Sequence, residues 1–179
     1  MVQHSGISCV DVAEFNRKYV TPKKGRTLIV GSKIYKTRTD RRKYYEDAVG
    51  IDMFDGDGVD RVLNLEEPLP DDLGKFAHID CISVLEHSQR PWLLASNLVM
   101  LMEEGSTIYV QVPFVWRVHG YPSDYWRMTV AGVSSIFAGV RWRAIQATGS
   151  DDSGRIPSMM HGDKVYFART QVCGFGIRE

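Results

Sequence analysis

The segment HGYPSDYWRMT at positions 119–129 combines side chains that can do acid–base chemistry with three aromatic rings. His119 and Asp124 are able to accept a proton from an oxygen or nitrogen nucleophile, and Tyr125 is a third titratable group beside them. Arg127 is able to hold an acidic group through two parallel hydrogen bonds. The candidate catalytic residues are therefore His119, Asp124 and Tyr125. The candidate acceptor-binding residues are Trp116, Tyr121, Trp126 and Arg127.

The same segment also has a purely structural interpretation. Tyr125 and Trp126 are able to pack under the helix that follows. Asp124 and Arg127 are able to form a local ion pair that orders the loop. These residue types are therefore compatible with two roles: the wall of a binding site, or a loop that is held in place by its own internal contacts.

Further polar or small residues follow apolar runs that are typical of buried strands. Gly31 ends the run TLIVG, Asp52 ends AVGID, and Glu86 and His87 follow HIDCISVL. In an open α/β sheet, ligands bind at the carboxyl ends of the strands. An acid in the position of Asp52 is well placed to accept hydrogen bonds from both hydroxyls of a ribose.

No metal site is predicted from the sequence. Aspartates surround two glycines in DMFDGDGVD at 52–60, but the spacing of a calcium loop would put Met53 at the first ligand position and Asn64 at the last. The cysteines are far apart and form no C-x-x-C pair, which argues against a zinc site and against a disulfide framework. They are Cys9, Cys81 and Cys173.

The elements that must position these residues alternate along the chain. Apolar runs predict strands at residues 27–31, 48–52, 61–65, 78–87, 106–114, 141–149 and 164–172. Helical spacing predicts helices at residues 10–19, 39–47, 90–105 and 129–139. Thr129 is a plausible cap for the last helix and Gly105 a stop for the third. Strands that alternate with helices and are apolar throughout indicate a mostly parallel sheet with helices on both faces.

The last two predicted strands break this alternation. Only a loop separates 141–149 from 164–172, which favours an antiparallel hairpin at the end of the sheet. The length favours a single domain over 1–179. We expect 1–25 to be an N-terminal helical extension and 150–163 to be a mobile loop.

The order TLIVGS, AVGIDM, VLNLEEPLP and HIDCISVLEHSQRPWLLASNLVMLMEEGSTIYVQVPF resembles the class I S-adenosylmethionine-dependent methyltransferases. The most specific part is SVLEH, followed by a helix, an E-x-G turn and an apolar strand that ends in Pro. In small members of that family, a segment similar to YPSDYWR also follows the fifth strand. The resemblance covers about residues 25–170. It implies a three-layer, Rossmann-like α/β sandwich whose seven-stranded sheet is mostly parallel, with one antiparallel inserted strand.

The resemblance also implies S-adenosylmethionine as the cofactor. Asp52 matches the acid that holds the ribose hydroxyls, and Met53 matches the apolar residue that packs on adenine. The first loop departs from the family pattern, because Lys33 and Tyr35 stand where the family has glycine. The cofactor-binding residues that the resemblance implies are Gly31, Ser32, Asp52, Met53, Asn64, Leu65, Ser83, Val84, Leu85 and His87.

The implied reaction is methyl transfer from S-adenosylmethionine to an oxygen or nitrogen nucleophile of a small polar acceptor. An alternative is a catalytically inactive member of this fold that serves as a binding or assembly module, which the altered first loop favours. Oxidoreduction with a nicotinamide cofactor is disfavoured, because Lys33 and Lys36 stand at the second and third glycine positions of the dinucleotide fingerprint.

Charge and hydropathy narrow the choice of partners. The chain has 22 basic and 22 acidic residues, so no net field draws it to nucleic acid. The basic run at 33–43 is interrupted by acids, as in solvated helix faces, so nucleic acid is not expected as a partner.

The longest apolar stretches fall short of the about 20 residues of a membrane helix. The first residues lack the pattern of a secretory signal, which favours a cytoplasmic location. The sequence leaves a homodimer open.

Overall fold

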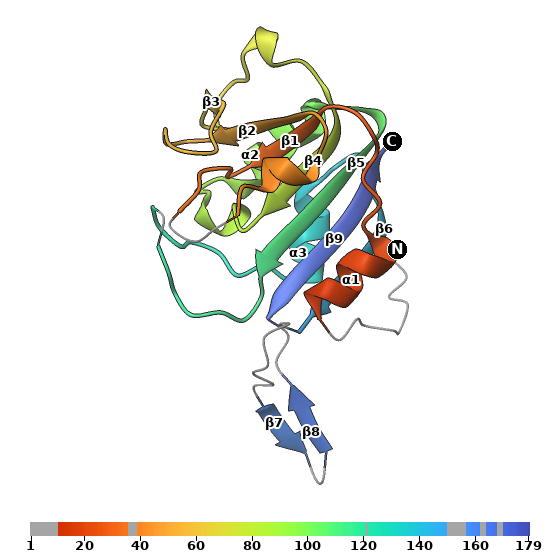
Figure 1. The fold of residues 1–179 in the computed structure, drawn as a ribbon. Helices are drawn as coiled ribbons and strands as arrows, with labels where there is room; N and C mark the ends of the chain where they lie inside the picture. The colour runs from red at the N-terminus through yellow and green to blue at the C-terminus, as the bar shows by residue number, and fades with distance from the viewer. Residues whose placement is uncertain (1–10, 36–38, 121, 150–156, 162–163, 168–169) are drawn as a thin grey trace.

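A seven-stranded sheet forms the centre of the molecule (Figure 1). The computed structural model describes residues 11–35, 39–120, 122–149, 157–161, 164–167 and 170–179. In the order β3-β2-β1-β4-β5-β9-β6, the strands from β3 to β5 are parallel to one another, and β9 is antiparallel to both of its neighbours. This confirms the predicted mostly parallel sheet. The strands are β1 (Thr27–Val30), β2 (Ala48–Asp52), β3 (Arg61–Val62), β4 (Phe76–Ile82), β5 (Met102–Pro113), β6 (Val140–Thr148) and β9 (Gln171–Arg178).

Helices cover the two faces of the sheet, which confirms the three-layer arrangement. On one face, α1 (Val12–Tyr19) buries Phe15 against Tyr109 and Phe175. On the other face, α2 (Pro91–Met100) and α3 (Val130–Ile136) cover the larger core (Figure 1). Both cores are built from residues that alternate along β5, because successive side chains of a strand point to opposite faces.

Two helices differ from their predicted extents. The stretch 39–47 forms only the 3₁₀ turn η1 (Arg41–Tyr44) before β2 begins. The helix predicted at 90–105 ends at Met100, and Gly105 lies inside β5 with a φ of 73°. The pairing between β4 and β5 shifts register near this glycine, so Gly105 serves a bulge in the strand and is no helix stop.

Thr129 caps α3 as predicted. Its hydroxyl oxygen accepts a hydrogen bond from the backbone N–H of Gly132 at 3.0 Å. This contact satisfies one of the free N–H groups at the start of the helix. The cap therefore fixes where the segment 115–128 ends and α3 begins.

The last strand of the main sheet along the chain is β9, and the strand predicted at 164–172 is divided: Lys164–Phe167 form β8 of a separate sheet, and β9 begins at Gln171. A Cβ atom at Gly174 would lie 2.6 Å from Trp142, and one at Gly176 would lie 2.4 Å from Val140. Only glycine leaves room there for the side chains of β6. Because glycine is depleted in strands, CGFGI does not look like a strand in the sequence, although β6 and β9 still form the expected antiparallel pair.

The predicted loop 150–163 is only partly described. Residues 157–161 form β7 (Pro157–His161), which pairs with β8 (Lys164–Phe167) in a separate two-stranded sheet. Figure 1 shows this hairpin projecting from the end of the main sheet. Residues 150–156 and 162–163, and residues 1–10 of the predicted N-terminal extension, lie outside the described residues.

The strands that carry site residues end earlier than predicted. β3 contains only Arg61 and Val62, and β4 ends at Ile82. Ser83 then takes a φ of 54°, which turns the chain into the 3₁₀ turn η3 (Leu85–His87). This turn brings the SVLEH motif across the end of the sheet. In the described part of the chain, no helix is both long and apolar enough to cross a membrane.

Candidate cofactor and acceptor pocket

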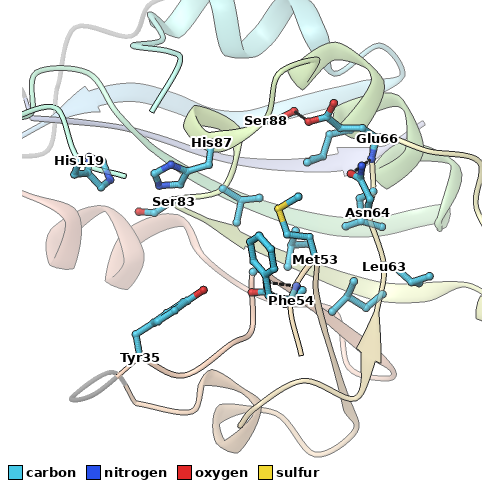
Figure 2. A pocket seen from close by; sticks show the side chains of 17 residues that line it. Tyr35, Met53, Phe54, Leu63, Asn64, Glu66, Ser83, His87, Ser88 and His119 are labelled. Atoms are coloured by element: carbon cyan, nitrogen blue, oxygen red, sulfur yellow. Dashed lines mark hydrogen bonds between the residues drawn. The ribbon is translucent and has the colours of Figure 1, made fainter. Parts of the chain in front are cut away.

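A pocket opens at the carboxyl ends of β1, β2, β3 and β4 (Figure 2). The empty space in and in front of it, which includes open solvent at the mouth, is about 960 Å³. Figure 2 shows His87 and His119 at one end of the pocket and Asn64 and Glu66 at the other. The lining residues are Val30, Gly31, Tyr35, Ile51, Asp52, Met53, Phe54, Leu63, Asn64, Leu65, Glu66, Ser83, Val84, His87, Ser88, Leu94 and His119.

The first loop begins at Gly31, which no other residue can replace without strain. Its φ is 65°, and a Cβ atom at this position would lie 2.6 Å from a methyl group of Val84. Ser32 is buried and does not line the pocket; it lies against Gly50, whose Cβ would meet the Ser32 hydroxyl at 2.7 Å. The loop therefore packs tightly between β2 and η3 without a second glycine.

Lys33 does not line the pocket. Its ammonium lies 5.5 Å from the centre of the Tyr35 ring and 5.8 Å from that of Phe54. Its stem fills the space beside Gly56, where a Cβ atom would lie 2.8 Å from Lys33 Cε. The lysine in the place of a family glycine does not fill the cleft, while Tyr35 contributes to the wall.

Asp52 is held in the pocket wall by the backbone. One carboxylate oxygen accepts a hydrogen bond from the N–H of Lys33 at 3.1 Å, and the other accepts one from the N–H of Phe54 at 3.0 Å. Carboxylate oxygens have further lone pairs, so both are able to accept hydrogen bonds from a ligand as well. Met53 and Phe54, each more than 40% exposed, extend an apolar surface next to this carboxylate.

A second carboxylate, Glu66, fixes the far end of the pocket. It accepts hydrogen bonds from the Ser88 hydroxyl at 2.8 Å, the Gln89 N–H at 2.8 Å and Arg90 Nε at 3.1 Å. Burial raises the pKa of Glu66, but these hydrogen bonds outweigh burial and hold the pKa below its usual value. Glu66 therefore stays ionised and ties the loop after β3 to the start of α2.

The turn η3 joins the pocket to the 115–128 segment. Nδ1 of His87 lies 2.7 Å from the carbonyl oxygen of Ser123, and the Tyr125 N–H donates to the carbonyl oxygen of Glu86 at 2.8 Å. Leu85, predicted to lie beneath the cofactor, is fully buried in the main core and does not line the pocket.

The 115–128 segment is ordered by an ion pair. Arg127 donates to both oxygens of Asp124, at 2.5 and 2.6 Å, and to the carbonyl oxygens of Trp116 and Arg117. The Arg127 guanidinium holds the pKa of Asp124 far below its usual value. The structural interpretation of this pair is confirmed. Arg127 is occupied inside the loop and does not line the pocket.

Of the aromatic and catalytic candidates in this segment, the structure brings only His119 into the wall of the pocket. Trp116, Tyr125 and Trp126 are each at least 37% exposed and lie outside the lining. Trp126 donates from Nε1 to the carbonyl oxygen of Ser88 and touches the Trp92 ring, and neither Asp124 nor Arg127 reaches the pocket. Tyr121 lies outside the described residues.

The sequence analysis missed part of the lining. Tyr35, Phe54 and Glu66 are within a few residues of predicted positions, and their closeness in sequence to Lys33, Asp52 and Asn64 was an available signal. Ser88 directly follows His87 and had the same signal. Leu94 had none, because its placement depends on how α2 crosses the strand ends.

Two arginines of the basic run at 33–43 form ion pairs within the fold. Arg41 donates to the carbonyl oxygen of Val30 at 2.6 Å and to Asp80 at 3.0 Å. Arg42 binds Asp40 and Asp60. The contacts of Arg41 tie η1 to β1 and β4.

The sequence has no match among protein-family models or curated protein sequences. The fold is similar to that of several solved structures. A 1,6-didemethyltoxoflavin-N1-methyltransferase from Burkholderia thailandensis, solved with its substrate and S-adenosylhomocysteine, has a TM-score of 0.63 and 11% identity over 87% of this chain and 72% of that chain.

Two further structures show the same likeness. An S-adenosylmethionine-dependent methyltransferase from Archaeoglobus fulgidus has a TM-score of 0.60 and 14% identity over 87% of this chain and 86% of that chain. The N-methyltransferase NodS from Bradyrhizobium japonicum, solved with S-adenosylhomocysteine, has a TM-score of 0.54 and 8% identity over 86% and 77% of the two chains. This chain therefore has the fold of the class I S-adenosylmethionine-dependent methyltransferases.

Proposed function

We propose that this protein transfers a methyl group from S-adenosylmethionine to an oxygen or nitrogen nucleophile of a small polar acceptor. The observation that carries the proposal is the position of Asp52. Its carboxylate stands at the carboxyl end of β2 in the wall of a pocket, and two backbone N–H groups fix its orientation. A preorganised acceptor for two hydroxyl groups is what a ribose requires.

The walls on either side of Asp52 suit the remaining parts of the cofactor. Met53 and Leu65 offer apolar contacts to an adenine ring, and Asn64 offers its edge a hydrogen bond. Gly31 and the chain at Ser83–Val84 also line the pocket, and we place the methionine portion there. Ser32 and Leu85 support these two segments from behind the wall.

His119 is the residue that we assign to the acceptor. Its Nδ1 lies 3.0 Å from the Asp124 carboxylate, which keeps a proton on Nδ1 and leaves the Nε2 lone pair available. With no ion bound, that lone pair can accept the proton of the nucleophile. Trp116, Tyr125 and Trp126 stand outside the lining, so we assign them to the entrance, where an acceptor would pass.

Isothermal titration of the purified protein with S-adenosylmethionine and S-adenosylhomocysteine tests the proposal. We expect saturable binding of both compounds. No heat of binding at millimolar ligand, from protein that is folded by circular dichroism, would remove the proposal.

The alternative of an inactive binding module has one observation in its favour. Trp92 and Trp126 contact each other edge to face and remain 47% and 37% exposed, which is unusual for two tryptophans at one surface. In this alternative, a partner protein covers the pair, and binding survives Asp52→Ala. In the first proposal, Asp52→Ala removes cofactor binding.

We also propose a cytoplasmic location, because the two cysteines within the described residues, Cys81 and Cys173, are free buried thiols. A homodimer stays a prediction that sedimentation can check.

A further inference from the structure

Three potential metal ligands meet at one end of the pocket. Glu86 and His87 come from η3, and His119 comes from the 115–128 segment. One ligand atom from each residue lies within 4.8 Å of the other two. Figure 2 shows the His87 and His119 side chains next to each other, and their ring centres are 4.9 Å apart with the planes nearly perpendicular.

Both imidazole rings have a hydrogen-bond acceptor beside Nδ1. Nδ1 of His87 lies 2.7 Å from the carbonyl oxygen of Ser123, and Nδ1 of His119 lies 3.0 Å from the Asp124 carboxylate. Carbonyl and carboxylate oxygens only accept hydrogen bonds, so we assign the ring proton to Nδ1 in each case, and Nε2 carries a lone pair. Histidines that ligate metals almost always donate their other ring N–H to a carboxylate or carbonyl oxygen in this way.

Glu86 supplies the negative charge. It is 1% exposed, and its Oε1 lies 3.8 Å from Nε2 of His87, which is beyond hydrogen-bond range. Ligands that hold one ion at about 2.0–2.2 Å are themselves about 3–3.5 Å apart. The spacing of Oε1 and Nε2 is close to this value, and small side-chain rotations would bring the three ligand atoms onto one ion.

The charges around the cluster also favour a cation. Asp124 is paired with Arg127, and the carboxylate of Glu86 is buried next to His87. Buried carboxylates are usually paired or coordinate metals. A divalent ion would add positive charge beside Glu86 and would attract an anionic ligand atom.

We propose that Glu86, His87 and His119 bind a divalent transition-metal ion of the Zn²⁺ type. Two imidazoles and one carboxylate are a ligand set that suits zinc and its first-row neighbours, whereas Mg²⁺ and Ca²⁺ prefer oxygen ligands. Three protein ligands leave at least one coordination position open, as in catalytic zinc sites. His87 and His119 line the pocket, so the open position faces it.

An acceptor with an oxygen ligand, such as a hydroxyl or carboxylate group, would occupy this position; this use of the ion rests on the proposed function. A bound ion would lower the pKa of an acceptor hydroxyl group, and the hydroxyl proton would leave to water at the open mouth of the pocket. Because the ion would occupy the Nε2 lone pair of His119, this histidine would hold the ion and would not accept the proton itself. The sequence predicted no metal here, because Glu86 and His119 are far apart in the chain.

Titration of the metal-free full-length protein with Co²⁺ and Zn²⁺ tests the site. The protein is first stripped with a chelator, and Co²⁺ binding is followed by visible absorption, with Zn²⁺ as competitor. We expect one equivalent of each ion to bind at one site. His119→Gln and Glu86→Gln should each weaken binding more than about tenfold. Glu104→Gln, an exposed carboxylate on β5, is the matched control and should bind as the original protein does.

Two outcomes would overturn the metal site: the stripped protein binds neither ion, or His119→Gln, whose side chain is partly exposed and tolerates replacement, binds as tightly as the control. Binding of S-adenosylhomocysteine is measured on the same samples. If the protein binds S-adenosylhomocysteine but neither Co²⁺ nor Zn²⁺, the metal site alone is removed. Ion binding without nucleoside binding would remove the proposed function and leave the site.

Discussion

The Asp124 carboxylate connects Arg127 to His119. It receives two hydrogen bonds from the Arg127 guanidinium and one from the backbone N–H of His119 at 2.9 Å, and it lies 3.0 Å from Nδ1 of the same histidine. The pKa of Asp124 is lowered, chiefly by Arg127, so the carboxylate stays ionised in the neutral range. One ion pair therefore orders the loop and also orients the only residue of that loop segment that reaches the pocket among those described.

Asp124→Asn should destabilise the protein by about 2–3 kcal/mol and lower methyl transfer at least about tenfold. The amide is uncharged and cannot accept all the hydrogen bonds that Arg127 and His119 donate. Urea unfolding and a transfer assay measure the two effects. The stability loss should shrink below about pH 4, because a carboxyl group with a depressed pKa stabilises only where it is ionised. An Asp124→Asn protein with the stability and activity of the original would contradict the role of this carboxylate.

Asp52→Asn should weaken the binding of S-adenosylhomocysteine by about tenfold to a hundredfold, because hydrogen bonds to a charged acceptor contribute about 1.5–3 kcal/mol. Calorimetric titration measures the change. Asp55→Asn is the matched control: Asp55 lies in the same loop, is exposed and does not line the pocket. Equal affinities of the two variants would mean that Asp52 does not hold the ribose.

Lys33→Ala should leave the affinity for S-adenosylhomocysteine within about threefold of the original. The Lys33 side chain contacts Tyr35, Phe54 and Gly56 and does not line the pocket. Loss of the exposed cation–π contacts would cost about 0.5–1 kcal/mol of stability. Fluorescence titration of the original protein and of Lys33→Ala, measured side by side, compares the two affinities. An increase in affinity above tenfold would show instead that the lysine obstructs the cofactor.

Most of the sheet could be predicted from the sequence, because buried parallel strands such as TLIV in β1 consist of consecutive apolar residues. The last strand could not. Gly174 and Gly176 in β9 are required by Trp142 and Val140 on β6, and this close approach exists only once the two strands are paired.

The candidate site also has residues that could be predicted from the sequence and residues that could not. Asp52 and Gly31 were predictable, because position at a strand end is a local property that survives folding. The side-chain directions in the 115–128 segment were not, because they depend on contacts with η3: the His87–Ser123 and Tyr125–Glu86 bonds turn His119 into the pocket and leave Tyr125 outside it. Residue types in a loop reveal possible chemistry, and packing selects which of them face the ligand.

From the burial of His78, we predict that the free energy of unfolding of this protein decreases in mild acid. This histidine is fully buried between the rings of Tyr45 and Phe175, its Nδ1 lies 2.9 Å from the Thr107 hydroxyl, and its Nε2 has no hydrogen-bond partner among the described residues. Burial lowers the pKa of His78 to about 4. The unfolded chain, with a histidine pKa of about 6.5, binds a proton first. The stability that neutral His78 confers is therefore complete above about pH 6.5 and decreases as the pH falls toward 4.

Between pH 7 and pH 5, His78 alone should lower the free energy of unfolding by about 2 kcal/mol. Urea unfolding at a series of pH values measures this slope. His78→Gln should reduce the slope while it lowers stability at every pH, because glutamine does not titrate. His119→Gln is the matched control, since His119 is partly exposed at the pocket, and it should keep most of the slope. If the original protein and His78→Gln had the same slope, another group would have to bind the proton that we assign to His78.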